Sequence, residues 1–131
     1  MPLHPLLLLT LFVFAGTLCL TLALVPLFAR VATARGLVDQ PNGRKVHTTP
    51  IPRIGGAAIF IAFYLTLGLA ALIFPAVSRP LIVEPENMLL IAGSVLAFAV
   101  GLVDDFKRLR ARQKFALQLA AGGLAYLGGI R

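Results

Sequence analysis

The chain has 131 residues, of which 59% are hydrophobic and only 13% are charged. A water-soluble domain needs a polar surface that this composition cannot supply, so a membrane protein is indicated. The net charge of +7 comes from basic residues in two short connectors between apolar runs, which membrane insertion alone explains, and nucleic-acid binding is therefore not expected.

Four apolar runs follow one another along the chain. A helix needs roughly 20 apolar residues to cross a hydrocarbon core about 30 Å thick. The first two runs are long enough, the third crosses only with its flanking residues, and the fourth stops at Gly128 and Gly129. These runs predict an all-α, polytopic membrane protein with about four transmembrane helices. The predicted helices are 6–28, 55–74, 88–103 and 115–130, with cytoplasmic loops at about 29–54 and 104–114.

The first run is predicted to remain as a membrane span. It has no basic segment before it and no small-residue cleavage site after it, so it does not resemble a signal peptide. It contains Cys19, the single cysteine, which rules out a disulfide within the chain. We expect this thiol to be buried and inert.

The connectors predict the orientation in the membrane. Five basic residues lie in the first connector and five in the third, whereas the second has only Arg79, beside Glu84 and Glu86. Because cytoplasmic loops carry the excess of Lys and Arg, the first and third connectors are predicted to be cytoplasmic. The Arg79 loop and the N-terminus are then outside.

The first connector contains several residues that constrain the backbone. Gly36 is a predicted helix C-cap, and Asp39 lies where a turn is expected. Pro50 and Pro52 favour an extended stretch, after which Gly55 opens the next helix.

Four basic side chains of this connector allow two interpretations. They can grip phosphates, with the arginines making bidentate contacts. They can also serve only to set topology and to contact anionic lipid head groups. The residues are Arg44, Lys45, His47 and Arg53.

The third connector begins with a pair of carboxylates at the inner membrane face. Asp104 and Asp105 end an apolar run, and acidic residues so close to hydrocarbon are functional candidates. Mg²⁺ takes one or two carboxylates together with substrate phosphates. Neighbouring helical side chains point about 100° apart, so one would bind the ion and the other would hold a water, a proton or a basic partner. Ordinary pairing with Lys107, Arg108 or Arg110 is the alternative.

The two cytoplasmic connectors together resemble a known family. GLVDQPNGRKVHTTPIPRIGG, then a helical hairpin, then GLVDDFKRLRARQKFALQ is similar to the polyprenyl-phosphate N-acetylhexosamine-1-phosphate transferases. Within them the pattern is most similar to the bacterial UDP-GlcNAc:undecaprenyl-phosphate GlcNAc-1-phosphate transferases, which begin the synthesis of cell-envelope polysaccharides. The resemblance runs from Arg35 to Gln118.

The resemblance implies an enzyme of the bacterial plasma membrane. An undecaprenyl phosphate attacks the sugar-bearing phosphorus of a UDP-sugar, and UMP leaves. The cofactor implied is Mg²⁺, with Mn²⁺ as an alternative, held by Asp104 and Asp105, one of which assists deprotonation of the lipid phosphate. Lys114 matches a phosphate-binding lysine, and Arg44, Lys45, His47 and Arg53 match the family's first basic loop.

The chain also departs from this family in its length. Family members have about ten helices, with a further essential aspartate and a histidine-rich segment in later loops. The expectation is therefore an N-terminal fragment that is inactive alone. A small four-helix transporter acting as a dimer is the alternative, although every acidic residue lies in a connector or at a helix end. A homodimer is also allowed for the transferase.

Overall fold

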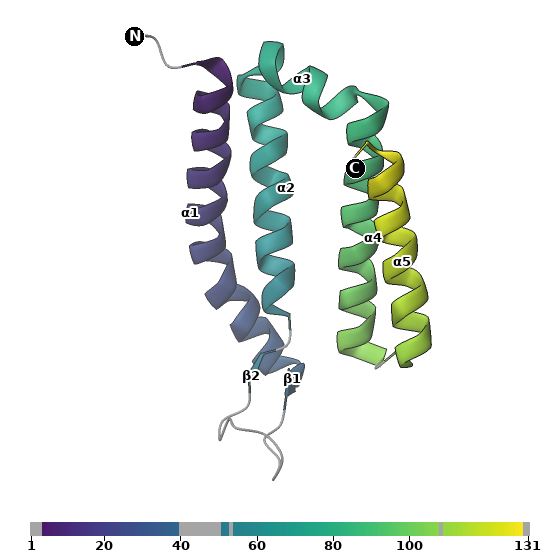
Figure 1. Cartoon of the computed structure of the whole chain (residues 1–131). Coiled ribbons are helices and arrows are strands. Elements are labelled where there is room, and N and C mark those ends of the chain that lie inside the picture. The colour runs from purple at the N-terminus through teal and green to yellow at the C-terminus, as the bar shows by residue number, and fades with distance from the viewer. Residues whose placement is uncertain (1–3, 40–50, 53, 108, 130–131) are drawn as a thin grey trace. The chain divides into compact units, whose positions relative to one another are not determined.

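The computed structural model describes residues 4–39, 51–52, 54–107 and 109–129. This part of the chain is helical apart from one short pair of strands, in agreement with the predicted fold class (Figure 1). It divides into two compact units, residues 11–68 and residues 1–10 with 69–131, which are described separately. The elements are α1 (Pro5–Ala34), β1 (Val38–Asp39), β2 (Ile51–Pro52), α2 (Gly55–Ile73), α3 (Pro75–Val83), α4 (Pro85–Lys107) and α5 (Ala111–Leu127).

Three of the described helices, α1, α2 and α4, are long and apolar enough to cross a membrane. They correspond to the first three predicted spans. The fourth predicted span corresponds to α5, which has 17 residues and is not among these three. The number of helices that cross the bilayer, and the outside position of the N-terminus, stay predictions.

The helices continue past the ends of their apolar runs. α1 ends at Ala34 instead of residue 28, and α4 ends at Lys107 instead of residue 103. A helix can extend into polar sequence as long as its last carbonyls find donors. At the end of α1, the N–H of Leu37 donates to the Ala32 carbonyl (2.8 Å) and that of Gly36 to the Thr33 carbonyl (3.2 Å). This is a Schellman motif, and the φ of +69° at Gly36 confirms the predicted cap.

In the unit of residues 11–68, α1 and α2 approach each other closely at a glycine. A Cβ placed on Gly16 would lie 2.6 Å from Cγ2 of Thr66, so a larger residue there would require Thr66 or one of the helices to shift. Thr66 is buried, and its hydroxyl donates to the Ala62 carbonyl at 2.8 Å. Small residues at such contacts are typical of membrane helices, because packing rather than hydrophobicity holds them together.

Two further features of this unit concern α1. The helix changes direction along its length in Figure 1, and Pro26 supplies the reason, since it has no N–H for the preceding turn. The predicted burial of Cys19 is wrong, because this residue lies exposed on the helix surface. In a membrane-spanning helix an exposed apolar position meets lipid, so hydrophobicity does not require burial within the protein.

The ends of the first connector are joined by β1 and β2. Val38 pairs with Pro52 and Asp39 with Ile51 in an antiparallel ladder. The predicted extended conformation before α2 is confirmed at Ile51–Pro52, and α2 begins at the predicted Gly55. The ladder therefore places residues 38–39 next to residues 51–52.

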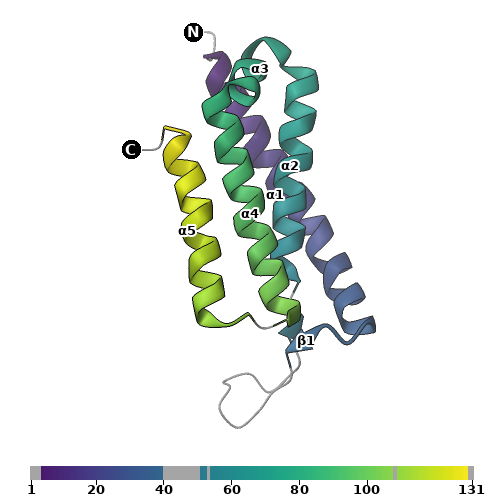
Figure 2. The ribbon, with the colours of Figure 1, turned by 90° about the vertical axis from the view of Figure 1, so that its right-hand side faces the viewer.

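In the other unit, α4 and α5 lie side by side as an antiparallel pair (Figures 1 and 2). Two glycines allow their backbones to approach. A Cβ on Gly93 would lie 3.0 Å from the Ala121 carbonyl oxygen, and one on Gly128 would lie 2.6 Å from that of Glu86. The hairpin is therefore tightly packed at its middle and at its far end.

This packing predicts a difference between two glycines of α4. Valine at Gly93 must push against the backbone of α5, which typically costs about 1–3 kcal/mol. Valine at Gly101 meets open space in the same helix, and because valine has a somewhat higher helix propensity than glycine, no loss of stability is expected there. We expect Gly93→Val to unfold at a clearly lower temperature than Gly101→Val, measured by circular dichroism in detergent micelles. Equal unfolding temperatures would contradict the close contact.

Candidate active site

The connector between α4 and α5 is short and internally hydrogen-bonded. The backbone N–H of Arg110, the residue before α5, donates to Oε1 of Gln113 at 3.2 Å. This is one half of a capping box; the other half would need an acceptor on Arg110, and a guanidinium has none. Gln113 thus satisfies one N-terminal donor of α5 and defines where the helix begins.

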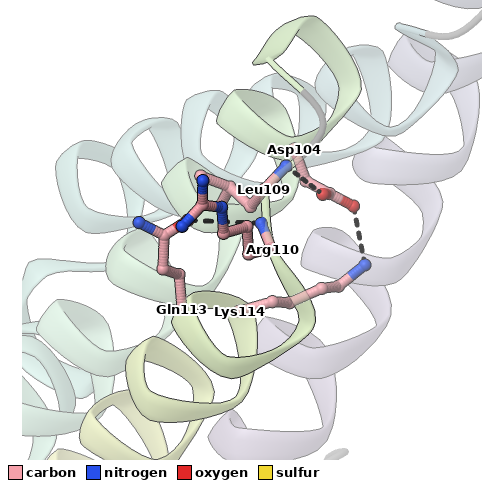
Figure 3. Close-up of polar contacts among 5 residues, drawn as sticks. All are labelled: Asp104, Leu109, Arg110, Gln113 and Lys114. Carbon is pink, nitrogen blue, oxygen red and sulfur yellow. Dashed lines mark hydrogen bonds and ion pairs between the residues drawn. The ribbon is translucent and has the colours of Figure 1, made fainter.

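Asp104 connects the last turn of α4 to this connector and to α5 (Figure 3). Its Oδ1 accepts a hydrogen bond from the backbone N–H of Leu109 at 3.0 Å. Its Oδ2 lies 2.7 Å from Nζ of Lys114, which donates a charge-assisted hydrogen bond. The Asp104 side chain is 25% exposed and that of Lys114 is 42% exposed, so both remain accessible to a ligand. The two carboxylate oxygens of Asp104 therefore hold the connector through Leu109 and α5 through Lys114.

The ion pair changes the titration of Lys114. The hydrogen bond from its ammonium to Asp104, together with the charges of Asp104 and Asp105, raises the pKa of Lys114 above its ordinary value, against a smaller opposing effect of desolvation. Because the pKa is raised in the folded state, the ion pair contributes its full share to the free energy of unfolding below the unfolded-state pKa of lysine. This stabilisation is lost only as the pH rises through the folded-state pKa. Lys114 is therefore positively charged throughout the neutral range.

Asp105 is the exposed neighbour of Asp104 on α4. Its charge acts on the same ammonium group, so two carboxylates and one lysine form a single electrostatic cluster. Within the ranges that the structure describes, no group of three or more His, Cys, Asp or Glu side chains could hold a metal. A divalent ion at Asp105 would then complete its coordination with water and substrate phosphates, which is common for Mg²⁺.

The predicted site residues fall into two groups. The structure describes three of them and brings Asp104 and Lys114 into direct contact, with Asp105 beside them. The roles predicted for Arg44, Lys45, His47 and Arg53 concern positions outside the described residues.

Two contributors to the site were missed from the sequence. The backbone N–H of Leu109 has no signature in the sequence, because any residue except proline supplies it. Gln113 carried a signal: it stands three residues after the last non-helical residue, where Glu or Gln typically completes a cap.

The fold and the cluster define a helical protein with membrane-length helices and a carboxylate–lysine site where α4 meets α5. Comparison with known proteins identifies the class: the chain is homologous to the polyprenyl-phosphate GlcNAc-1-phosphate transferases, which confirms the resemblance found in the sequence. No protein-family model matches the chain. No solved structure matches it either.

Three relatives illustrate the homology. The chain is 30% identical over 118 residues to the "Probable undecaprenyl-phosphate N-acetylglucosaminyl 1-phosphate transferase" of Bacillus subtilis, covering 90% of this chain and 30% of that protein. It is 35% identical over 117 residues to the decaprenyl-phosphate N-acetylglucosaminephosphotransferase of Mycobacterium tuberculosis, covering 85% and 28%. It is 33% identical over 96 residues to the undecaprenyl-phosphate alpha-N-acetylglucosaminyl 1-phosphate transferase of Escherichia coli, covering 72% and 23%. The chain thus spans less than a third of the length of each.

Proposed function

We propose that this chain forms part of an enzyme that transfers GlcNAc-1-phosphate from UDP-GlcNAc to undecaprenyl phosphate in the bacterial plasma membrane. An oxygen of the lipid phosphate forms a bond to the sugar-bearing phosphorus, the bond from that phosphorus to the bridging oxygen breaks, and UMP leaves. The observation that carries the proposal is the Asp104–Lys114 pair with Asp105 beside it, at the end of a membrane-length helix. The names of the relatives supply the substrates.

The charges of the cluster suit this reaction. Two phosphate anions must approach each other, so positive groups have to offset the accumulating negative charge. Lys114 is charged at neutral pH and partly exposed, and it can donate to a phosphate oxygen while Asp104 holds its position. Asp104 orients this lysine and the connector backbone.

The donor set also fits Mg²⁺. Carboxylate oxygens are hard ligands of the kind that this ion prefers, and Asp105 supplies them next to the position where Lys114 would meet the phosphates. When bound, the ion would supply Lewis-acid stabilisation of the pyrophosphate. Asp105 is the more exposed of the two carboxylates, whereas Asp104 is half-buried and holds Leu109 and Lys114. We therefore assign ion binding or proton transfer to Asp105 and positioning to Asp104.

The test uses membranes that contain the 131-residue chain, or a chimera in which this chain replaces the matched part of the Bacillus subtilis relative. With labelled UDP-GlcNAc, undecaprenyl phosphate and Mg²⁺, we expect the chimera to produce lipid-linked GlcNAc and the chain alone to produce none. The intact relative is the positive control, and EDTA should stop the reaction. A folded chimera that makes no lipid-linked sugar from any UDP-N-acetylhexosamine would refute the proposal.

A further inference from the structure

The short helix α3 joins two helices of membrane length, α2 and α4. Only Phe74 separates it from the end of α2, and only Glu84 separates it from the start of α4. The carbonyl of Phe74 begins α3, because it accepts hydrogen bonds from the N–H groups of Val77 (3.1 Å) and Ser78 (3.0 Å). In Figure 1, α3 leads from the end of α2 to the start of α4, and both of these helices are long and apolar enough to cross a membrane.

In α3 the uncharged polar side chain is buried and apolar side chains are exposed, which is the opposite of a helix that faces water. Ser78, its only uncharged polar residue, is 1% exposed and donates its hydroxyl to the Phe74 carbonyl at 2.8 Å. Leu81 and Val83 are instead 47% and 61% exposed. A water-facing helix would place its serine outside and its leucine and valine inside, since burying apolar surface is favourable. This arrangement is that of a helix whose outer surroundings are themselves apolar.

The exposed apolar surface of α3 continues that of the spanning helix before it. Leu72 is 79% exposed, more than any other large hydrophobic residue that the structure describes, and Ile73 is also exposed. Between Leu72 and Val83 the only charged side chain is Arg79, which is exposed and makes no ion pair with the described residues. An arginine at the boundary between acyl chains and head groups can pack its aliphatic carbons against the acyl chains while its guanidinium binds a lipid phosphate.

We propose that α3 lies in the membrane interface, with Leu81 and Val83 among the acyl chains and Arg79 bound to lipid phosphates. The leaflet is the outer one in the topology predicted from the basic connectors. Lipid is the occupant favoured by the continuity with the apolar surface of α2 and by Arg79, the one cationic residue of α3. The proposal does not depend on the catalytic role of the α4–α5 connector.

Tryptophan fluorescence can test the depth of α3, because the native chain contains no tryptophan. Leu81→Trp and Val83→Trp would be placed in vesicles made from lipids brominated near the head group or near the chain end. Phe14→Trp is the deep control, since Phe14 is exposed in the middle part of α1. We expect both α3 variants to lose more fluorescence to shallow than to deep bromine and to resist iodide, with the depth order reversed for Phe14→Trp.

Two results would overturn the placement of α3. Strong quenching by iodide with little quenching by brominated lipid would place it in water, and protection from both quenchers would mean that protein covers it. The lipid contact of Arg79 is tested in the Leu81→Trp background with vesicles containing phosphatidylglycerol. Arg79→Glu should shift the emission to longer wavelength, whereas Arg79→Lys should leave it unchanged. An unshifted Arg79→Glu variant would remove the phosphate contact from the proposal.

Discussion

Replacing Asp105 with Asn in the chimera is expected to lower the rate of GlcNAc-1-phosphate transfer by at least about 100-fold. Asparagine has nearly the same shape, but it cannot accept a proton and is a weaker ligand for Mg²⁺. A positioned proton-transfer group alone typically contributes about 10²–10⁴-fold. The rate would be measured as labelled lipid-linked sugar formed per unit time over a range of Mg²⁺ concentrations.

The Mg²⁺ series separates the two roles open to Asp105. Partial recovery of the Asp105→Asn variant at high Mg²⁺ would mean that the carboxylate binds the ion, and an equal loss at all concentrations would mean that it handles the proton. Glu86→Gln is the matched control, because it removes one carboxylate from the opposite end of the same helix. The assignment is wrong if Asp105→Asn transfers sugar as fast as Glu86→Gln.

Replacing Lys114 with Met is expected to reduce transfer by about 10²–10³-fold, the usual effect of removing one donor that stabilises developing negative charge. The raised pKa keeps this ammonium charged at the pH of the assay, so the wild-type group acts as a permanent cation. Methionine fills a similar volume without charge. Initial rates against UDP-GlcNAc concentration would show whether kcat falls or KM rises.

Lys107→Met provides the control for charge alone, since Lys107 lies exposed in the last turn of α4. It should keep nearly the full rate. Asp104→Asn should cost less than Lys114→Met, about 10–100-fold, because Asp104 acts through the lysine that it orients and its amide oxygen can still accept from Leu109. A phosphate-binding role for Lys114 is excluded if Lys114→Met and Lys107→Met transfer at the same rate.

Much of the fold could be predicted because membrane helices leave a strong trace in the sequence. The apolar runs gave three helices of membrane length, and Gly36 and Gly55 marked where α1 is capped and α2 begins. The helix α3 was not predicted, because its apolar residues and Pro75 and Pro80 are equally typical of an extended outer loop. Its helical state depends on hydrogen bonds to Phe74, which the sequence does not display.

The candidate site could be predicted only as a set of residue types. The pair Asp104–Asp105 and the lysine ten residues later follow from the sequence and its resemblance to known transferases, and their roles stay predictions. Which aspartate faces the lysine depends on how α5 packs against α4, so it required coordinates. The burial of Cys19 was mispredicted for a different reason, namely that lipid and protein interior favour the same side chains.

The bonds of Asp104 also affect the stability of the first turn of α5. The first turn of α5 contains no acidic residue and carries Arg112 and Lys114, whose positive charges oppose the helix dipole at that end. The compensating carboxylate comes from α4, through Leu109 and Lys114. The N-terminal carboxylate of α5 is thus supplied by the preceding helix, so the stability of the first turn of α5 depends on α4.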